Sequence, residues 1–144
     1  MDKIPELKIN KYAMYETFGV RMGDGFLDAL TEPLSLKENI ENESRLEHGK
    51  RIIVDENPKI ASREVLLDFT ITGSSPEDFL NKKNRFLAMM YKGVIALQVP
   101  QVSPDVYHLV YRGKGSDYGM NAQRTFCHIM LKFVEPNPTN RSED

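Results

Sequence analysis

The most restrictive feature of this sequence is a strictly alternating segment that leads directly into the start of a helix. Apolar side chains occupy every second position of this segment, at Val65, Leu67, Phe69 and Ile71. Because successive side chains of a strand point to opposite faces, the pattern predicts a strand with one buried face. Such a strand has to pack that face against another layer of secondary structure.

The helix predicted after this strand has a start signal, an end signal and a buried face. Ser75 is a candidate N-cap, Pro76 suits the first helical position, and Asp78 supplies a carboxylate three residues after the cap. Gly93 ends the helix after about four to five turns. One amphipathic face collects the side chains of Phe79, Lys83, Phe86, Leu87 and Met90.

Further strands are predicted on both sides of this pair. Alternating or short β-branched runs indicate strands at residues 12–22, 51–54, 94–99, 106–112 and 125–134. One helical turn is predicted at residues 26–30, and a flexible loop at the glycine-rich residues 113–119. The fold class is therefore α+β, with an antiparallel β-sandwich or barrel-like sheet and one flanking α-helix.

Length predicts a single domain. A chain of 144 residues is in the range of one domain and can bury one core. We expect residues 1–144 to form one domain, with its core at about residues 12–136. The prolines of Glu135–Pro138 cannot continue a sheet, so residues 137–144 are expected to be a polar tail.

Charge and hydropathy argue against nucleic acid and membranes as partners. The 19 Lys and Arg residues are balanced by 21 Asp and Glu residues, without a basic stripe that would displace counterions from phosphates. No segment has the roughly 18 apolar residues of a membrane span. Met1–Asn10 lacks the apolar core of a signal peptide, so we expect synthesis in the cytoplasm.

Two histidines and one cysteine are the candidates for metal binding or nucleophilic catalysis. His108 and His128 are expected on neighbouring strands, near Asp68 or Glu64, but no third ligand has a fixed spacing to either histidine. Cys127 falls in the apolar register of its strand, while His128 points to the other face. We therefore predict outward-facing histidines and a core cysteine, with no catalytic residue and no metal site.

Neither the glycines nor the paired carboxylates indicate a cofactor. A phosphate-binding loop needs Gly-Lys followed by Ser or Thr and a helix, whereas Gly113–Lys114–Gly115 leads into a strand. Glu41 and Glu43 lie in a charged segment without an apolar pocket that would separate their pKa values. We expect the glycines to form a mobile connection and the carboxylates to be solvated or paired across an interface.

The charged excursion at residues 34–51 is the candidate interaction segment. It has no clear periodicity and is longer than most connections inside compact domains, and such segments are usually functional or disordered. Leu36, Ile40 and Leu46 are apolar anchors among charges of both signs, and Arg45 and Arg51 are suited to bidentate pairing with carboxylates of a neighbouring subunit. We predict that the excursion is an assembly arm; the alternative is a solvated loop that only connects two strands.

The order of several segments, rather than any single motif, carries a family resemblance. These segments span about residues 12–138 and comprise Phe18–Val20, Asn39–Arg51, Arg63–Gly73, Ser75–Phe79, the short strand after Gly93, Tyr107–Tyr111 and Phe133–Pro138. In this order they resemble the tail-tube-like domain of bacteriophage distal tail proteins, which join the tail tube to the baseplate or fibre assembly.

The resemblance implies both an architecture and a role. It implies a β-sandwich with one flanking helix, assembled as a hexameric ring around a central channel, in a structural subunit of a phage or prophage tail. The implied partners are other copies of the chain and other tail proteins, and the implied location is the virion tail, with synthesis in the host bacterial cytoplasm. Many distal tail proteins carry a second, carbohydrate-binding-like domain, which we do not expect here. A short distal tail protein, a tube subunit and another tail adaptor all fit.

Two other classes of protein remain for comparison. A small-molecule-binding or carrier domain could use the same β-sandwich without catalysis, but it would contain a closed apolar pocket and stay monomeric. An enzyme would need a nucleophile, a base and an orienting group, and the sequence does not supply such a set. We therefore predict that the chain is not an enzyme, and native mass would separate a ring from a carrier.

Overall fold

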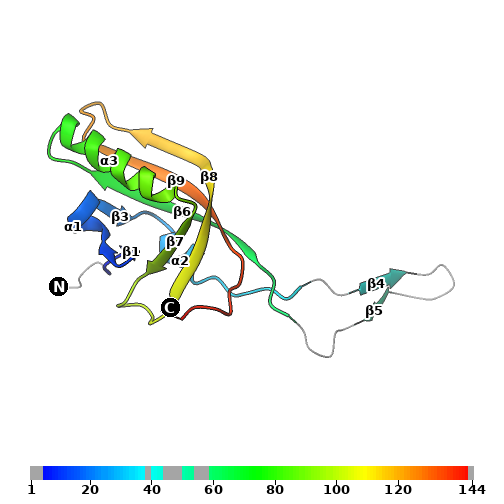
Figure 1. Ribbon diagram of the computed structural model, residues 1–144. Coiled ribbons are helices and arrows are strands. Elements are labelled where there is room, and N and C mark those ends of the chain that lie inside the picture. The colour runs from blue at the N-terminus through cyan, green and yellow to red at the C-terminus, as the bar shows by residue number, and fades with distance from the viewer. Residues whose placement is uncertain (1–4, 38–39, 44–49, 54–58, 143–144) are drawn as a thin grey trace.

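The computed structural model describes residues 5–37, 40–43, 50–53 and 59–142 (Figure 1). Before the excursion the elements are β1 (Lys8–Ile9), β2 (Tyr12–Ala13), α1 (Met14–Phe18), β3 (Val20–Met22) and α2 (Phe26–Leu30). The excursion contains β4 (Ile40–Glu43) and β5 (Lys50–Ile53). After it follow β6 (Arg63–Thr72), α3 (Pro76–Met90), β7 (Val94–Gln98), β8 (Val106–Met120) and β9 (Phe126–Glu135).

Seven of these strands form one antiparallel sheet. Their order is β2-β1-β7-β8-β9-β6-β3, so that β2 and β3 end an open sheet. The long helix α3 lies along this sheet in Figure 1. The predicted α+β class, with an antiparallel sheet and one long flanking helix, is confirmed. The strands make one continuous sheet, and β4 and β5 form a separate pair.

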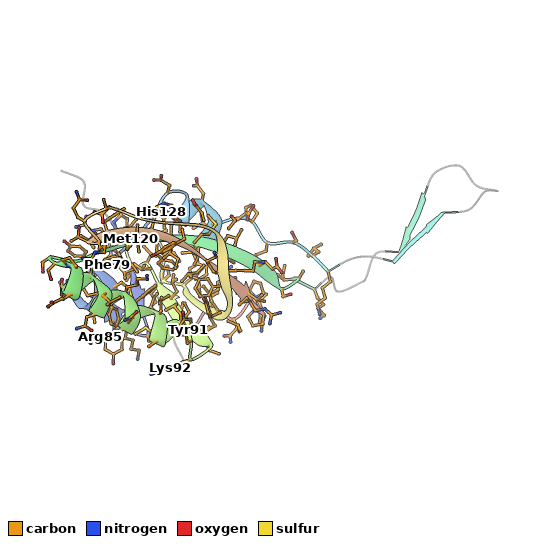
Figure 2. The ribbon with its side chains drawn as sticks, turned by 90° about the horizontal axis from the view of Figure 1, so that it is seen from above. Phe79, Arg85, Tyr91, Lys92, Met120 and His128 are labelled. Carbon is orange, nitrogen blue, oxygen red and sulfur yellow. The ribbon has the colours of Figure 1, made fainter. Side chains whose placement is uncertain are left out.

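A large part of the core lies between α3 and the neighbouring strands β6 and β9. In β6 and β9 the inward residues face one another in register, as Val65 with Phe133, Leu67 with Leu131, Phe69 with Ile129 and Ile71 with Cys127. All eight side chains are buried, as the alternation predicted. From α3, Phe79, Phe86 and Met90 are buried against this layer, and the rings of Phe86 and Phe69 lie 5.3 Å apart. Figure 2 shows how densely side chains fill this space.

The predicted start of α3 is confirmed in detail. The hydroxyl of Ser75 accepts a hydrogen bond from the backbone N–H of Asp78 at 3.1 Å, and Pro76 occupies the first turn. The carboxylate of Asp78 accepts in return from the backbone N–H of Ser74 at 2.9 Å. This bond, together with Lys82, lowers the pKa of Asp78. Donors that a helix start leaves free are thus satisfied by side chains.

The predicted strand at residues 12–22 is wrong in its middle. Only β2 and β3 are strands there, and Met14–Phe18 forms α1. Met14 and Phe18 are four residues apart, a spacing that also fits one face of a helix, and both are buried. Gly19 ends α1 with a left-handed backbone (φ 65°), and its N–H donates to Tyr15 O at 2.9 Å.

The predicted loop at residues 113–119 is also wrong, because β8 continues through it to Met120. The pairing of β8 with β9 shifts register between Tyr111 and Gly113 and again between Lys114 and Tyr118. The glycines accommodate side chains of the partner strand, since a Cβ at Gly115 would lie 2.8 Å from Met130 and one at Gly119 would lie 2.7 Å from His128. Small residues here make room for neighbours within a strand.

The structured region begins before the predicted core. Leu7 and Ile9 are buried, and β1 pairs with β7 through Ile9 and Leu97. Sequence reasoning missed this strand because only two residues of it are in the sheet, too few to show alternation.

Replacing Gly19 should destabilise the protein more than replacing Gly25. Both have a positive φ, 65° and 71°, so Ala at either position should cost about 1–2 kcal/mol of left-handed strain. At Gly19 the new Cβ would also overlap the carbonyl oxygen of Thr72, whereas at Gly25 it meets nothing within 4 Å. In urea unfolding we expect Gly19→Ala to lose at least about 1 kcal/mol more than Gly25→Ala. Equal losses would contradict the close approach to Thr72.

Candidate assembly surface

The excursion leaves and re-enters the body along a short antiparallel ladder. Leu36 forms an isolated bridge with Ile60. Next to it, the N–H of Lys37 donates to Lys59 O and the N–H of Ala61 donates to Ser35 O, both at 2.8 Å. The outgoing and returning segments are therefore held together at the root of the excursion.

The excursion itself contains a β-hairpin that the sequence did not predict in full. A strand was expected at residues 51–54, and β5 starts at Lys50 and pairs with β4. Ile40 stands opposite Ile53, and Arg51 opposite Asn42. Figure 1 shows this hairpin beyond the end of the seven-stranded sheet.

The structure places three of the five predicted interface residues. Ile40 and Arg51 lie on the two paired strands, and Leu36 lies at the root with 54% of its surface exposed. Arg45 and Leu46 lie outside the described residues. That these five residues contact a neighbouring subunit stays a prediction.

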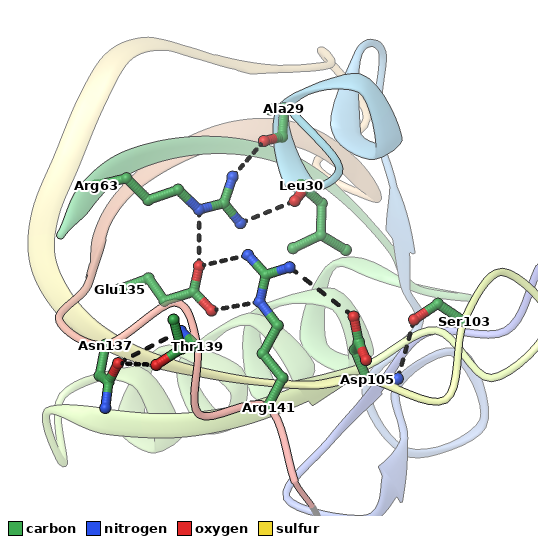
Figure 3. Close-up of polar contacts among 9 residues, drawn as sticks. All are labelled: Ala29, Leu30, Arg63, Ser103, Asp105, Glu135, Asn137, Thr139 and Arg141. Carbon is green, nitrogen blue, oxygen red and sulfur yellow. Dashed lines mark hydrogen bonds and ion pairs between the residues drawn. The ribbon is translucent and has the colours of Figure 1, made fainter. Parts of the chain in front are cut away.

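A buried ionic cluster fixes the body next to the root (Figure 3). Arg63, where the chain returns to the sheet, donates from Nε to Glu135 Oε1 at 2.7 Å. Its terminal nitrogens donate to Ala29 O at 3.1 Å and Leu30 O at 2.8 Å. One guanidinium thus joins the end of α2, the start of β6 and the end of β9.

The C-terminal segment completes this cluster. Arg141 donates to both carboxylate oxygens of Glu135, each at 3.0 Å, and lies 3.8 Å from an Asp105 oxygen. Its guanidinium also lies 4.6 Å from the centre of the Tyr107 ring. The tail predicted at residues 137–144 is therefore attached to the body over its described part.

Glu135 is fully buried, and its charge is stabilised by its partners. Burial alone would raise the pKa of this carboxyl, but the hydrogen bonds and positive charges of Arg141 and Arg63 outweigh it and hold the pKa below its ordinary value. Sequence reasoning missed this cluster. The available signal was that Arg63 and Glu135 continue the inward registers of their strands, where an ion needs a partner.

A surface hollow of about 700 Å³ lies beside the root. It is lined by Lys37, Lys59, Ile60, Ser62, Pro136, Asn137 and Thr139. The lining comes from both segments of the ladder and from the C-terminal segment, so the hollow is a polar surface with two lysines. It offers no closed apolar pocket of the kind that a carrier domain needs.

The two histidines are not brought together. His108 stands opposite Ala96, and its Nε2 lies 2.9 Å from Ser142 O. His128 stands opposite Thr70, and its Nδ1 lies 3.7 Å from the carboxylate of Asp117. Within the described part of the chain, no three His, Cys, Asp or Glu side chains are grouped so that they could hold a metal ion.

Two other groups named from the sequence have separate environments. Burial raises the pKa of the Cys127 thiol, which is fully buried in the core. Burial also raises the pKa of Asp68, whose Oδ1 has no hydrogen-bond partner among the described residues. His128 opposes this shift of the Asp68 pKa, and the charge of Asp117 adds to it. Neither group has the exposed, electropositive surroundings of a reactive nucleophile.

The helices of the described residues include none that is long and apolar enough to cross a membrane.

This geometry defines an α+β domain with a seven-stranded sheet and a projecting hairpin. No protein-family model matches the sequence, and a comparison with curated proteins gives no significant match. Among solved structures, the chain is similar to the crystal structure of the Dit protein (gp 19.1) of SPP1, described as a paradigm of the hub adsorption apparatus in phages that infect Gram-positive bacteria. The TM-score is 0.66 at 14% sequence identity, over 94% of this chain and 51% of that one. The chain thus spans about half the length of that protein and shares its fold over that half.

Proposed function

We propose that this chain is a non-catalytic structural subunit of a phage or prophage tail. The observation that carries the proposal is the shared fold, which extends over 94% of the chain, with a protein of a phage adsorption hub. The proposed position is the virion tail, as a distal tail or tube-like adaptor between the tail tube and the tip. The partners would be further copies of the chain in a ring, with six as the expected number, and other tail proteins.

The hairpin is proposed as the arm that joins neighbouring subunits. Its root is held by backbone hydrogen bonds and lies beside the buried Glu135 cluster, so it has a firm attachment to the body. In a closed ring each contact is head-to-tail, so the arm of one subunit meets a different surface on the next. Leu36, Ile40 and Leu46 would supply apolar anchors, and Arg45 and Arg51 would pair with carboxylates of that surface.

Replacing residues 36–48 with a short Gly/Ser linker should convert the ring into folded monomers. Mass is measured by light scattering across protein concentration, and wild type is expected near six times 16.5 kDa. Unfolding in urea checks that the body of the variant is intact.

Two outcomes would count against these proposals, each against a different one. Wild type that stays monomeric at every concentration contradicts the ring and favours the carrier alternative. A folded variant that assembles as well as wild type leaves the ring in place but shows that the arm does not hold it together.

A further inference from the structure

The exposed side of α3 carries Glu77 in its first turn and positive charge further along, at Arg85, with Lys92 just after the helix. From residue 79 to residue 104 the sequence contains Lys82, Lys83, Arg85 and Lys92 and no acidic residue. Arg85 and Lys92 are exposed, and Figure 2 shows both along α3 at the margin of the molecule. Within residues 5–37 and 59–142, neither forms an ion pair.

Apolar side chains accompany these charges. Leu80 is 53% exposed and Tyr91 is 66% exposed, one near each end of α3. The ring of Tyr91 rests partly against Tyr111, with 5.8 Å between the ring centres. Exposed aromatic groups beside arginine are typical of protein interfaces, which are enriched in aromatic residues and arginine.

A second surface of the same chain has the opposite charge. Asp24, Asp28 and Glu32 are exposed at intervals of four residues on α2 and its flanks, and no Lys or Arg occurs from residue 22 to residue 36. A hollow of about 300 Å³ lies among Pro5, Met22 and residues 23–28, beside the first two carboxylates. Among the described residues these three carboxylates also form no ion pair.

Within one copy, the described residues form no ion pair between these two surfaces. The buried side of α2 presents Phe26 to Phe69, with 5.2 Å between the ring centres, and the buried side of α3 presents Phe86 to the same ring at 5.3 Å. Both helices therefore turn their apolar sides toward one shared ring in the core. The charged residues Asp24, Asp28, Glu32, Arg85 and Lys92 are exposed and so do not point into this core.

We propose that the basic side of α3 docks onto the acidic surface around α2 of a second copy of this chain. The inference rests on the proposed ring, for which it supplies a second contact beside the arm. Two different surfaces of opposite sign make a head-to-tail contact, which can repeat from subunit to subunit until it closes. Complementary charge sets the partner and the register of such a contact, and Tyr91 and Leu80 add apolar area.

Charge reversal tests this contact. Arg85→Glu with Lys92→Glu places acid against acid, and Asp28→Lys with Glu32→Lys places base against base. Each pair of substitutions should raise the dissociation constant of assembly about tenfold or more, because like charges repel across the contact. All four changes in one chain, or an equimolar mixture of the two double variants, should restore assembly to within a few-fold of wild type.

The control is Lys132→Glu, an exposed residue on β9, which should leave assembly unchanged. Light scattering across protein and salt concentration gives the dissociation constants, and urea unfolding confirms that every variant is folded. If wild type and both double variants assemble equally well, this contact is overturned and the proposed function stands. If neither the fourfold variant nor the mixture assembles, direct pairing of the two charged surfaces is overturned. Wild type that never assembles overturns both this contact and the proposed ring. A short DNA duplex is the second probe. If Arg85→Glu/Lys92→Glu loses binding to the duplex while its assembly is unchanged, the basic surface is assigned to nucleic acid instead.

Discussion

Phe86→Ala is expected to lower the free energy of unfolding by about 3–5 kcal/mol, the usual cost of removing a large ring from a core. Phe86 is fully buried, and its ring lies 5.3 Å from that of Phe69 and 6.4 Å from that of Phe18. It therefore joins α3 to both β6 and α1. Alanine would leave a cavity where these three elements meet, and unfolding in urea measures the loss.

Leu80→Ala on the same helix is the matched control. Leu80 is 53% exposed, so its truncation should cost less than about 1 kcal/mol. The two variants share helix, method and replacement residue, and they differ in burial. A Phe86→Ala loss below about 1 kcal/mol, or one equal to that of Leu80→Ala, would place Phe86 outside the core.

Glu135→Ala should be comparably destabilising at neutral pH, for an electrostatic reason. Removing one partner of a buried ionic group leaves uncompensated charge, which typically costs about 3–5 kcal/mol. Here Arg63 and Arg141, both mostly buried, would lose their carboxylate together. Lys82→Ala is the control, because the Lys82–Asp78 pair is partly exposed and such pairs contribute roughly 0–1 kcal/mol.

The pH dependence gives the Glu135 prediction a second readout. The pKa of Glu135 is lower in the folded state than its ordinary value of 4.5, so the folded state favours the ionised carboxylate. Its contribution is fully present above pH 4.5 and is lost as the pH falls through the lower, folded-state pKa. The difference in unfolding free energy between wild type and Glu135→Ala should therefore shrink in acid. A difference that stays constant from neutral pH to below pH 3 would contradict an ionic role.

Sequence reasoning predicted most reliably those elements in which a local signal and the tertiary environment agree. In β6 the alternation of Val65 to Ile71 matches a sheet with one buried face. In α3 the Ser75 cap and the spacing of Phe79, Phe86 and Met90 fix both the start and the face of the helix. These elements position the core, so the α+β class followed from them.

The errors arose where one pattern fits two structures or where a contact is distant in sequence. Residues 12–22 fit a period of two, but the spacing of Met14 and Phe18 also fits a helical turn, which the left-handed Gly19 ends. The glycines of residues 113–119 indicated a loop because the side chains they accommodate belong to β9. No local pattern could bring Arg141 to Glu135, because that contact depends on the path of the chain after the last strand.

The excursion was predictable as a segment and not as a geometry. Its length and mixed charge singled out residues 34–51. The pairing of Ile40 with Ile53 was not predicted, because the charged residues 40–43 show no strand pattern. The sequence contains the opposite charges near α2 and α3, but only the fold shows which of these residues are exposed.

The closed root of the excursion has a consequence for how the length of the hairpin can vary. Arg63 and Leu30 flank the segment, and a hydrogen bond of 2.8 Å between them fixes its two ends in place. For a connection whose ends are already fixed, doubling its length costs only about 0.6 kcal/mol of closure entropy. Insertions and deletions at the far end of the hairpin would therefore alter its reach at little cost to the stability of the body. If the proposed ring forms, hairpins of different length would let the same body fit subunits at different spacings.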